Sequence, residues 1–118
     1  LAMTRARFAE DIAKLAGFSE VSKAFLTGMM SLMDAILDEP MSSVMSKLPL
    51  SKDIKDALIE GIGPIAQFLQ LIKFYEQAAW DDANALIQAL KLDSKSVPDA
   101  YHTAVQWANE QMKALGDN

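Results

Sequence analysis

The sequence predicts an all-α fold, and three observations support that class. Alanine occurs 18 times and leucine 14 times in 118 residues, whereas valine and threonine together occur 7 times. Alanine and leucine favour helices, while β-branched residues are enriched in strands. No run of alternating apolar and polar residues is long enough to suggest a strand. Short breaks rich in glycine, proline or polar residues separate about seven helical segments, and the length fits one unit over residues 1–118.

The first two helices are expected over residues 4–16 and 20–38. The first carries an apolar stripe at helical spacing and ends before Gly17, a residue type that often terminates helices in a left-handed conformation. Ser19 is the expected N-cap of the second helix. Because residues 24–37 are apolar on nearly every side, this helix is predicted to be central and buried. The stripe of the first helix consists of Phe8, Ile12 and Leu15.

Two shorter helices are expected over residues 40–47 and 51–60. Pro40 lies where a helix can begin, and Pro49 marks the end of the third helix because proline lacks the N–H group that helix continuation needs. Ser51 is the expected N-cap of the fourth helix.

Three further helices are expected over residues 64–79, 81–91 and 97–116. A break that contains two glycines and a proline at 61–64 precedes the fifth helix, and a polar loop at 93–96 precedes the seventh. The fifth helix is strongly apolar. The seventh has an inner stripe at helical spacing, which consists of Tyr101, Ala104, Val105, Ala108, Met112 and Leu115.

Composition narrows the class of protein. Hydrophobic residues make up 51% of the chain, which is too large a share for a disordered protein. No stretch of about 18 residues is free of charge, so a membrane-spanning helix is not expected. With 16 acidic and 11 basic residues the net charge is −5, and neither nucleic acid nor an anionic membrane surface is an expected partner. The chain has no cysteine for disulfides or thiolate metal sites, and a cytoplasmic location is expected.

A search for catalytic chemistry yields no site. The single histidine, His102, lies beside a polar helix face and is interpreted as a surface residue. The serines lack a Gly-x-Ser-x-Gly elbow and lie near helix starts and loops, where capping explains them better than nucleophilic catalysis. Gly61 and Gly63 lack the preceding strand of a phosphate-binding loop. Asp34 and Asp38 share a helix face, but helix packing explains them better than acid–base catalysis. We therefore predict no catalytic, metal-binding or cofactor-binding residue.

Five of the seven methionines cluster in the second and third predicted helices. Methionine fills irregular gaps in cores and also lines adaptable binding surfaces, so both interpretations stay open and core filling is favoured. If the cluster is a recognition surface, the candidate interface residues are Met29, Met33, Met41, Met45, Phe74 and Trp80.

A family resemblance rests on several short segments. Residues 24–34 carry the pattern Ala-Phe-Leu-x-Gly-x-x-Ser-x-x-Asp and are followed by a helix that begins with proline and methionine at 40–41. Further matching segments are residues 4–10, 48–50, 57–58, 101 and 104–108. Over residues 5–115 the chain resembles the second half of an HDOD domain, of the type found in bacterial signalling proteins that carry an EAL domain ahead of a modified HD-GYP domain.

The resemblance implies an all-α fold related to HD-type phosphohydrolases but without their chemistry. In those hydrolases the block that resembles residues 28–30 continues into a His-Asp metal-binding dyad, whereas this chain has Ser31 and Leu32 at the two positions. Neither side chain can hold a catalytic metal. The implied function is a non-catalytic signalling or scaffold module that mediates protein–protein interaction in a bacterial cyclic-di-GMP signalling protein. It implies no cofactor, and an EAL domain is the implied partner.

Two alternatives stay open. One is an HD-GYP-type, metal-dependent cyclic-di-GMP phosphohydrolase whose metal ligands lie in a missing N-terminal half, because the front half of an HDOD domain would precede Arg5. The other is a free-standing adaptor that binds an amphipathic helix in a methionine-rich groove. A half-domain exposes the face that met its other half, so we also expect the isolated chain to form homo-oligomers.

Overall fold

The computed structural model describes residues 1–116, and within that range the chain forms helices and no strand, which confirms the all-α prediction. A π-helical turn, η1 (Asp56–Glu60), directly continues the fifth α-helix. The α-helices are α1 (Ala2–Leu15), α2 (Val21–Met30), α3 (Met33–Leu37), α4 (Met41–Ser46), α5 (Lys52–Lys55), α6 (Pro64–Glu76), α7 (Trp80–Ala89) and α8 (Ser96–Gly116).

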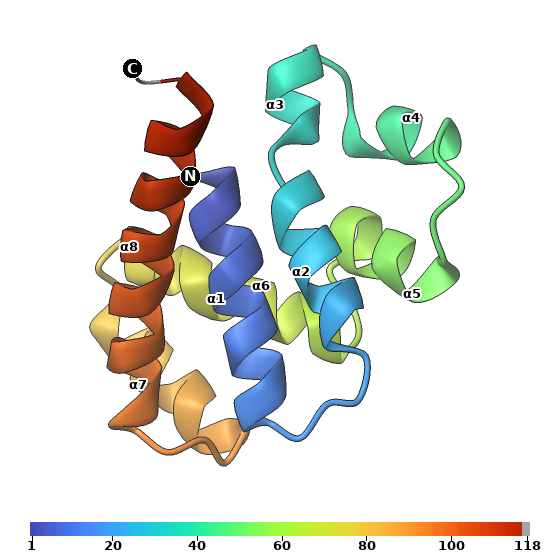
Figure 1. Cartoon of the computed structure of the whole chain (residues 1–118). Helices are drawn as coiled ribbons and strands as arrows, with labels where there is room; N and C mark the ends of the chain where they lie inside the picture. Colours follow the sequence, from blue (N-terminus) through green and yellow to red (C-terminus); the bar gives the residue numbers. More distant parts are fainter. Residues whose placement is uncertain (117–118) are drawn as a thin grey trace.

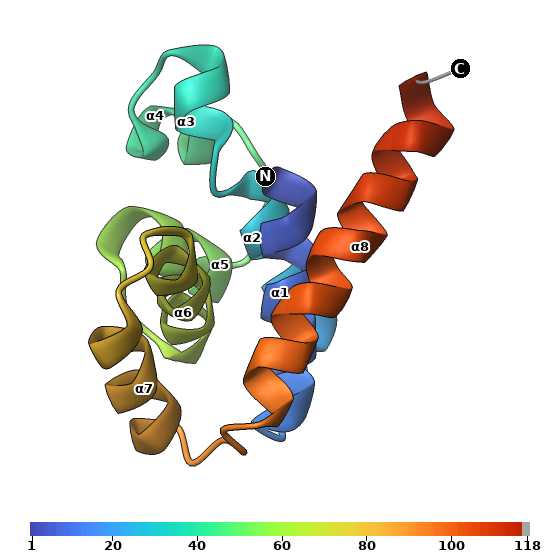
Figure 2. The same ribbon diagram turned by 90° about the vertical axis from the view of Figure 1, so that its left-hand side faces the viewer.

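Helix α1 is the centre of the packing. It lies between α2 and α8 and contacts both along its length, while α6 crosses behind it (Figure 1). The side view in Figure 2 shows α1, α2 and α8 as one layer, with α6 and α7 on one face of that layer. Helices α3 and α4 project from the end of the molecule at which α2 ends (Figures 1 and 2).

The main core forms between these two layers. Phe8 and Ile12 of the predicted stripe are fully buried, whereas Leu15, in the last turn of α1, is 44% exposed. The Phe8 ring packs against two tyrosines, with centroid distances of 5.7 Å to Tyr75 and 5.8 Å to Tyr101. The buried members of the core are Phe8, Ala9, Ile12, Ala13, Ala24, Phe68, Leu69, Leu71, Ile72, Ala83, Ile87, Leu92, Val97 and Ala104.

The predicted helix over residues 20–38 is two helices, and its second half is not buried. The Ser31 hydroxyl donates a hydrogen bond of 2.8 Å to the carbonyl oxygen of Gly28, and Leu32 has φ −110° and ψ 5°, outside the helical range. A serine that bonds back to its own helix competes with the backbone ladder, so α2 ends here. Helix α3 contains no buried residue, and Ile36 is 66% exposed.

The third and fourth predicted helices form a smaller packing group. Val44 and Met45 of α4 are buried, as are Ile54 of α5 and Ala57 of η1. Ser51 occupies the predicted N-cap position, but its hydroxyl donates to the Asp53 carboxylate rather than to the helix backbone. Within residues 1–116 no single helix is long and apolar enough to cross a bilayer; Lys52–Glu60 and Pro64–Glu76, bent by 42°, meet that requirement only as a pair.

Two residues of the predicted inner stripe of α8 are exposed in the structure. The stripe on this helix faces α1 as far as Ala108, which is buried, but Met112 is 60% and Leu115 is 72% exposed. The reason is length, because α8 has 21 residues and the antiparallel α1 has 14. The last turns of α8 therefore extend beyond the helix that would cover them, as Figure 2 shows.

Candidate functional site

A largely buried ion pair joins α1 to α6. Arg5 Nε donates to Glu76 Oε2 at 2.9 Å, and Arg5 Nη2 donates to Glu76 Oε1 at 2.8 Å. The Arg5 side chain is 10% exposed and the Glu76 side chain 18%. Two parallel charge-assisted hydrogen bonds fix the guanidinium and carboxylate planes relative to each other. The pair therefore links α1 to α6 at the point where the two helices cross.

Ser31 completes this network from α2. Arg5 Nη1 donates to Ser31 Oγ at 3.0 Å, while Ser31 Oγ itself donates to the Gly28 carbonyl oxygen. The hydroxyl is thus both an acceptor and a donor, and Ser31 is buried. In the described part of the chain, no buried side-chain nitrogen or oxygen lacks a hydrogen-bond partner. We call Arg5, Glu76 and Ser31 the guanidinium cluster.

Gly28 brings α2 close enough to α1 for this cluster to form. A Cβ atom at Gly28 would lie 2.6 Å from the backbone oxygen of Arg5 and 2.7 Å from the Cα of Ala6. Those distances are inside van der Waals contact, and the atoms belong to the helix backbone, which cannot move aside cheaply. The glycine of the Ala-Phe-Leu-x-Gly-x-x-Ser pattern therefore has a packing role.

The two positions that resemble a metal-binding dyad contain no ligand. Ser31 is committed to Arg5 and Gly28, and Leu32 is a half-buried residue at the start of α3. The charge beside Ser31 is a guanidinium, which repels a metal cation at short range. Over residues 1–116 no group of three His, Cys, Asp or Glu side chains is placed to hold a metal ion.

The candidate interface residues fall into three groups. Met45 is fully buried, so its assignment to an interface is wrong. The other interpretation of the methionines, that they fill the core, applies to it. Met29, Met33, Met41 and Phe74 are half-buried, and they lie on α2, α3, α4 and α6. Trp80, the first residue of α7, is 54% exposed, and its ring packs edge-on against Tyr75 at 5.3 Å. These residues therefore do not come from one helix face.

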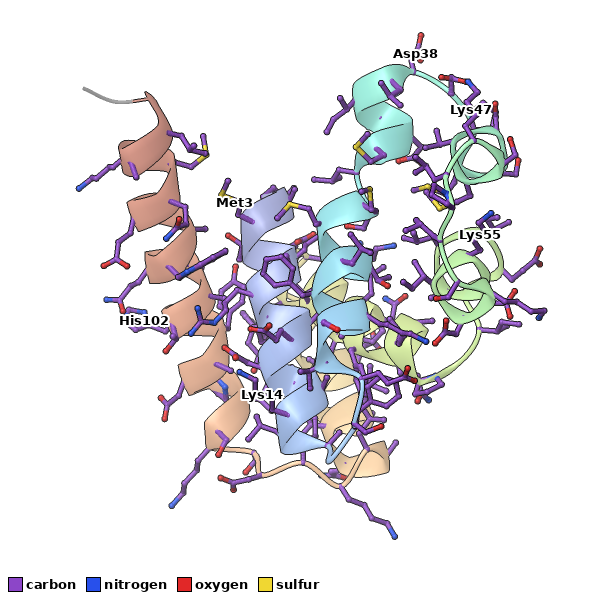
Figure 3. All side chains as sticks on the ribbon, turned by 45° about the vertical axis from the view of Figure 1, so that its right-hand side comes forward. Met3, Lys14, Asp38, Lys47, Lys55 and His102 are labelled. Carbon is purple, nitrogen blue, oxygen red and sulfur yellow. The ribbon has the colours of Figure 1, made fainter. Side chains whose placement is uncertain are left out.

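His102 lies on the outer face of α8, directed away from the other helices (Figure 3). It is exposed, as predicted for a surface residue.

A small cleft lies beside the break at 61–64. It has a volume of about 210 Å³ and is lined by Phe18, Glu20, Asp53, Asp56, Ile62, Gly63, Pro64 and Ile65. Lys23 Nζ lies 2.8 Å from Glu20 Oε2 and 3.1 Å from Asp53 Oδ2. Hydrogen bonds from the Ser51 hydroxyl and then from Lys23 hold the pKa of Asp53 below its ordinary value. Small-molecule pockets usually exceed about 300 Å³, so this cleft is small for such a ligand.

Sequence reasoning missed Arg5 and Glu76, although a signal for each exists. Arg5 precedes Phe8 by three residues and Ile12 by seven, so it continues the buried stripe of α1. Glu76 follows Ile72 by four residues and extends the buried face of α6 in the same way. A charged residue on a buried stripe needs a partner of opposite charge. Arg5 and Glu76 could therefore have been predicted from the sequence as a candidate ion pair.

Two curated bacterial proteins are similar to nearly the whole chain. The chain is 32% identical over 111 residues, or 93% of its length, to a cyclic di-GMP phosphodiesterase, CdgJ, of Vibrio cholerae. It is 27% identical over 114 residues, or 97% of its length, to the uncharacterized protein YuxH of Bacillus subtilis. The matches cover 26% and 27% of these relatives, so the chain spans about a quarter of their length. No family model and no solved structure matches the chain. The similarity to CdgJ supports the link to cyclic-di-GMP signalling that the sequence resemblance implies.

Proposed function

We propose that the chain is a non-catalytic, HDOD-like module of a cytoplasmic cyclic-di-GMP signalling protein, and that it acts through contacts with other proteins. The link to cyclic di-GMP is supported by the similarity to CdgJ over 93% of the chain. The HDOD-like assignment is supported by the segment at 24–34 and by the helix break that follows its serine.

The guanidinium cluster is the observation that carries the non-catalytic part of this proposal. At the place where an HD-type hydrolase would hold a metal, Ser31 accepts a hydrogen bond from Arg5, and Arg5 is bound by Glu76. A metal ion brought next to Ser31 would meet a fixed positive charge and would have to compete with it for the carboxylate. The local chemistry therefore favours helix packing over metal-dependent hydrolysis.

A role in protein contacts is supported by the exposed apolar residues. Among the described residues, nine large hydrophobic side chains are at least 39% exposed and are therefore accessible to a partner. In the proposed function the partner is the remaining part of the signalling protein, and an EAL domain is the candidate that the resemblance offers.

The catalytic question is tested with the purified chain, cyclic di-GMP and either Mg²⁺ or Mn²⁺. We expect no hydrolysis under conditions in which CdgJ, the positive control, converts its substrate. Hydrolysis by the chain would contradict the non-catalytic assignment. The phosphohydrolase alternative places its metal ligands outside this chain, so it is tested by metal binding and hydrolysis in a longer protein that carries the preceding half of the domain.

The scaffold question is tested by calorimetric titration of the chain with the part of CdgJ that lies outside the match. We expect binding that Trp80→Ala weakens, because Trp80 is a candidate interface residue and is 54% exposed. Ile62→Ala is the matched control, since Ile62 is an equally exposed apolar residue at 55% in another part of the molecule. Absence of binding, or equal effects of the two variants, would overturn the proposed interface.

A further inference from the structure

An exposed aromatic ring and two carboxylates line a hollow at the start of α7. The hollow has a volume of about 320 Å³ and is lined by Ala78, Ala79, Trp80, Asp81 and Asp82, and we call these five residues the Trp80 hollow. Helix α7 packs against α6 and lies at the opposite end of the molecule from α3 in both ribbon views (Figures 1 and 2). The hollow is open to solvent, since Trp80 is 54% exposed and both aspartates are exposed.

Hydrogen bonds of the backbone fix the two alanines of the hollow. The N–H of Ala79 donates to the carbonyl oxygen of Phe74 at 2.9 Å, and the N–H of Ala78 donates to that of Tyr75 at 3.2 Å. With Ala78 in the left-handed conformation (φ 55°), these two bonds form a Schellman motif at the end of α6. Because neither alanine has a side chain beyond Cβ, they leave the hollow unfilled.

The Trp80 ring is held from the side of the core. It packs edge-on against Tyr75, with ring centroids 5.3 Å apart and an interplanar angle of 88°. The Tyr75 ring in turn contacts Phe8 at 5.7 Å and Tyr101 at 5.1 Å. An aromatic ring that is already positioned loses little conformational freedom when a partner binds, so Trp80 is suited to anchor a contact.

The carboxylates of the hollow have no basic partner in the described part of the chain. Residues 74–90 contain three acidic residues and no basic one, and one of the three, Glu76, is bound by Arg5. Within residues 1–116 neither Asp81 nor Asp82 forms an ion pair. The dipole of α7 favours acidic residues in its first turn, but it does not account for an exposed tryptophan beside them. The hollow is therefore complementary to a positive charge.

The other tryptophan of the chain shows what such a group of side chains can hold. The guanidinium carbon of Arg7 lies 5.4 Å from the centroid of the Trp107 ring, and Arg7 Nε donates to Asp11 Oδ2 at 3.3 Å. One tryptophan ring and one carboxylate thus hold a guanidinium group within this chain. The Trp80 hollow offers the same two kinds of group, but over the described residues no arginine or lysine lies over its ring.

We propose that the Trp80 hollow is a docking site for an arginine side chain of a partner protein. The guanidinium group stacks on the Trp80 ring and donates hydrogen bonds to Asp81 and Asp82. Arginine fits better than lysine, because its planar guanidinium both stacks on a ring and presents several donors to carboxylates. This inference rests on the proposed function in protein contacts and names the chemistry of the residue that the partner contributes.

An NMR titration with a capped glycine–arginine–glycine peptide tests the site without any partner protein. The control peptide contains citrulline, which has the same shape as arginine without the charge. We expect only the arginine peptide, at concentrations up to about 100 mM, to cause a saturable shift of the Trp80 indole N–H signal, which Trp80→Phe identifies. The Trp107 signal should stay in place, because Arg7 already occupies that ring. Equal shifts with both peptides, or no saturable shift of the Trp80 signal, would show that the hollow is not an arginine site.

Charge variants test whether the carboxylates take part. Asp81→Asn combined with Asp82→Asn should raise the Kd of the arginine peptide at least about threefold. Asp99→Asn combined with Glu110→Gln is the matched control, because it removes the same charge from two exposed residues of α8, one of them also in a first helical turn. If both double variants weaken binding equally, the peptide responds to the net charge of −5 rather than to the hollow, and the proposal is wrong.

The calorimetric titration with the remaining part of CdgJ separates this inference from the proposed function. Absence of binding in that titration, together with arginine binding by the hollow, would contradict the proposed function alone. The opposite result is binding that Trp80→Ala weakens but that neither the Asp81→Asn, Asp82→Asn variant nor about 0.5 M NaCl changes. It would contradict the arginine site and leave the proposed function standing.

Discussion

Replacement of Glu76 by glutamine should destabilise the fold through Arg5. The variant keeps the shape of the side chain but removes its charge, so the Arg5 guanidinium stays largely buried without a counter-charge. Breaking a fully buried pair in this way costs about 3–5 kcal/mol. Because the two side chains keep 10% and 18% of their exposure and glutamine can still accept one hydrogen bond, we expect a loss of about 2–3 kcal/mol.

Urea unfolding followed by far-UV circular dichroism measures this loss. For a slope of about 1–2 kcal/mol per molar urea, the midpoint should fall by at least about 1 M. Glu110→Gln is the matched control, because Glu110 is exposed on α8, and it should shift the midpoint little. High salt should change the Glu76→Gln effect only slightly, since buried charges are weakly screened.

A double variant separates the charge argument from simple packing. Arg5→Met combined with Glu76→Leu removes both charges and keeps apolar volume, and such replacements of buried pairs are often neutral or stabilising. It should therefore be more stable than Glu76→Gln alone. A loss below about 0.5 kcal/mol for Glu76→Gln, or a double variant no more stable than the single one, would refute the reasoning.

Three further predictions concern single positions. Gly28→Ala should destabilise the fold by at least about 2 kcal/mol in urea unfolding, because its Cβ would overlap the α1 backbone, whereas Gly116→Ala, which meets nothing within 4 Å, should be neutral. Ala78 has a left-handed backbone conformation (φ 55°), which costs an alanine about 1 kcal/mol. Ala78→Gly should relieve this strain and raise the melting temperature by a few degrees. The control Ala85→Gly, inside α7, should lower the melting temperature. The pKa of Asp53 is lower in the folded protein than its ordinary value of 3.8, so the ionised carboxylate stabilises the fold at a pH above 3.8. This contribution is lost as the pH falls through the pKa of the folded state. The Asp53→Asn variant should therefore lose less stability than the wild type on acid unfolding, and an NMR titration should show the low carboxyl pKa directly.

The helical class and most helix boundaries could be predicted from the sequence because they depend on local signals. Phe8 and Ile12 recur at helical spacing, and both are buried as predicted. The break at Ser31 was missed because residues 24–37 are apolar on nearly every side, so no change of pattern marks the end of α2. What ends the helix is a hydroxyl bond to Gly28 and the Arg5 contact, and the second of these needs tertiary structure.

The guanidinium cluster could be predicted only in part. Periodicity shows that Arg5 and Glu76 lie on buried faces, but their pairing across 71 residues depends on how α6 crosses α1. The exposure of the last turns of α8 could not be predicted for a similar reason. A stripe through Met112 and Leu115 indicates which face is apolar, but it contains no information on whether a neighbouring helix is long enough to cover that face.

The separation of α3 from the main core has a consequence for local opening. Helix α3 has five residues, none of them buried, so few contacts oppose its unfolding, and its backbone amides should exchange with solvent faster than those of α1. A partner of any kind that docked on α3 would have to order this segment, and part of the association free energy would be used for that ordering. A partner that covers α3 should therefore slow amide exchange selectively in Met33–Leu37, whereas a partner that binds elsewhere should leave exchange in this segment fast.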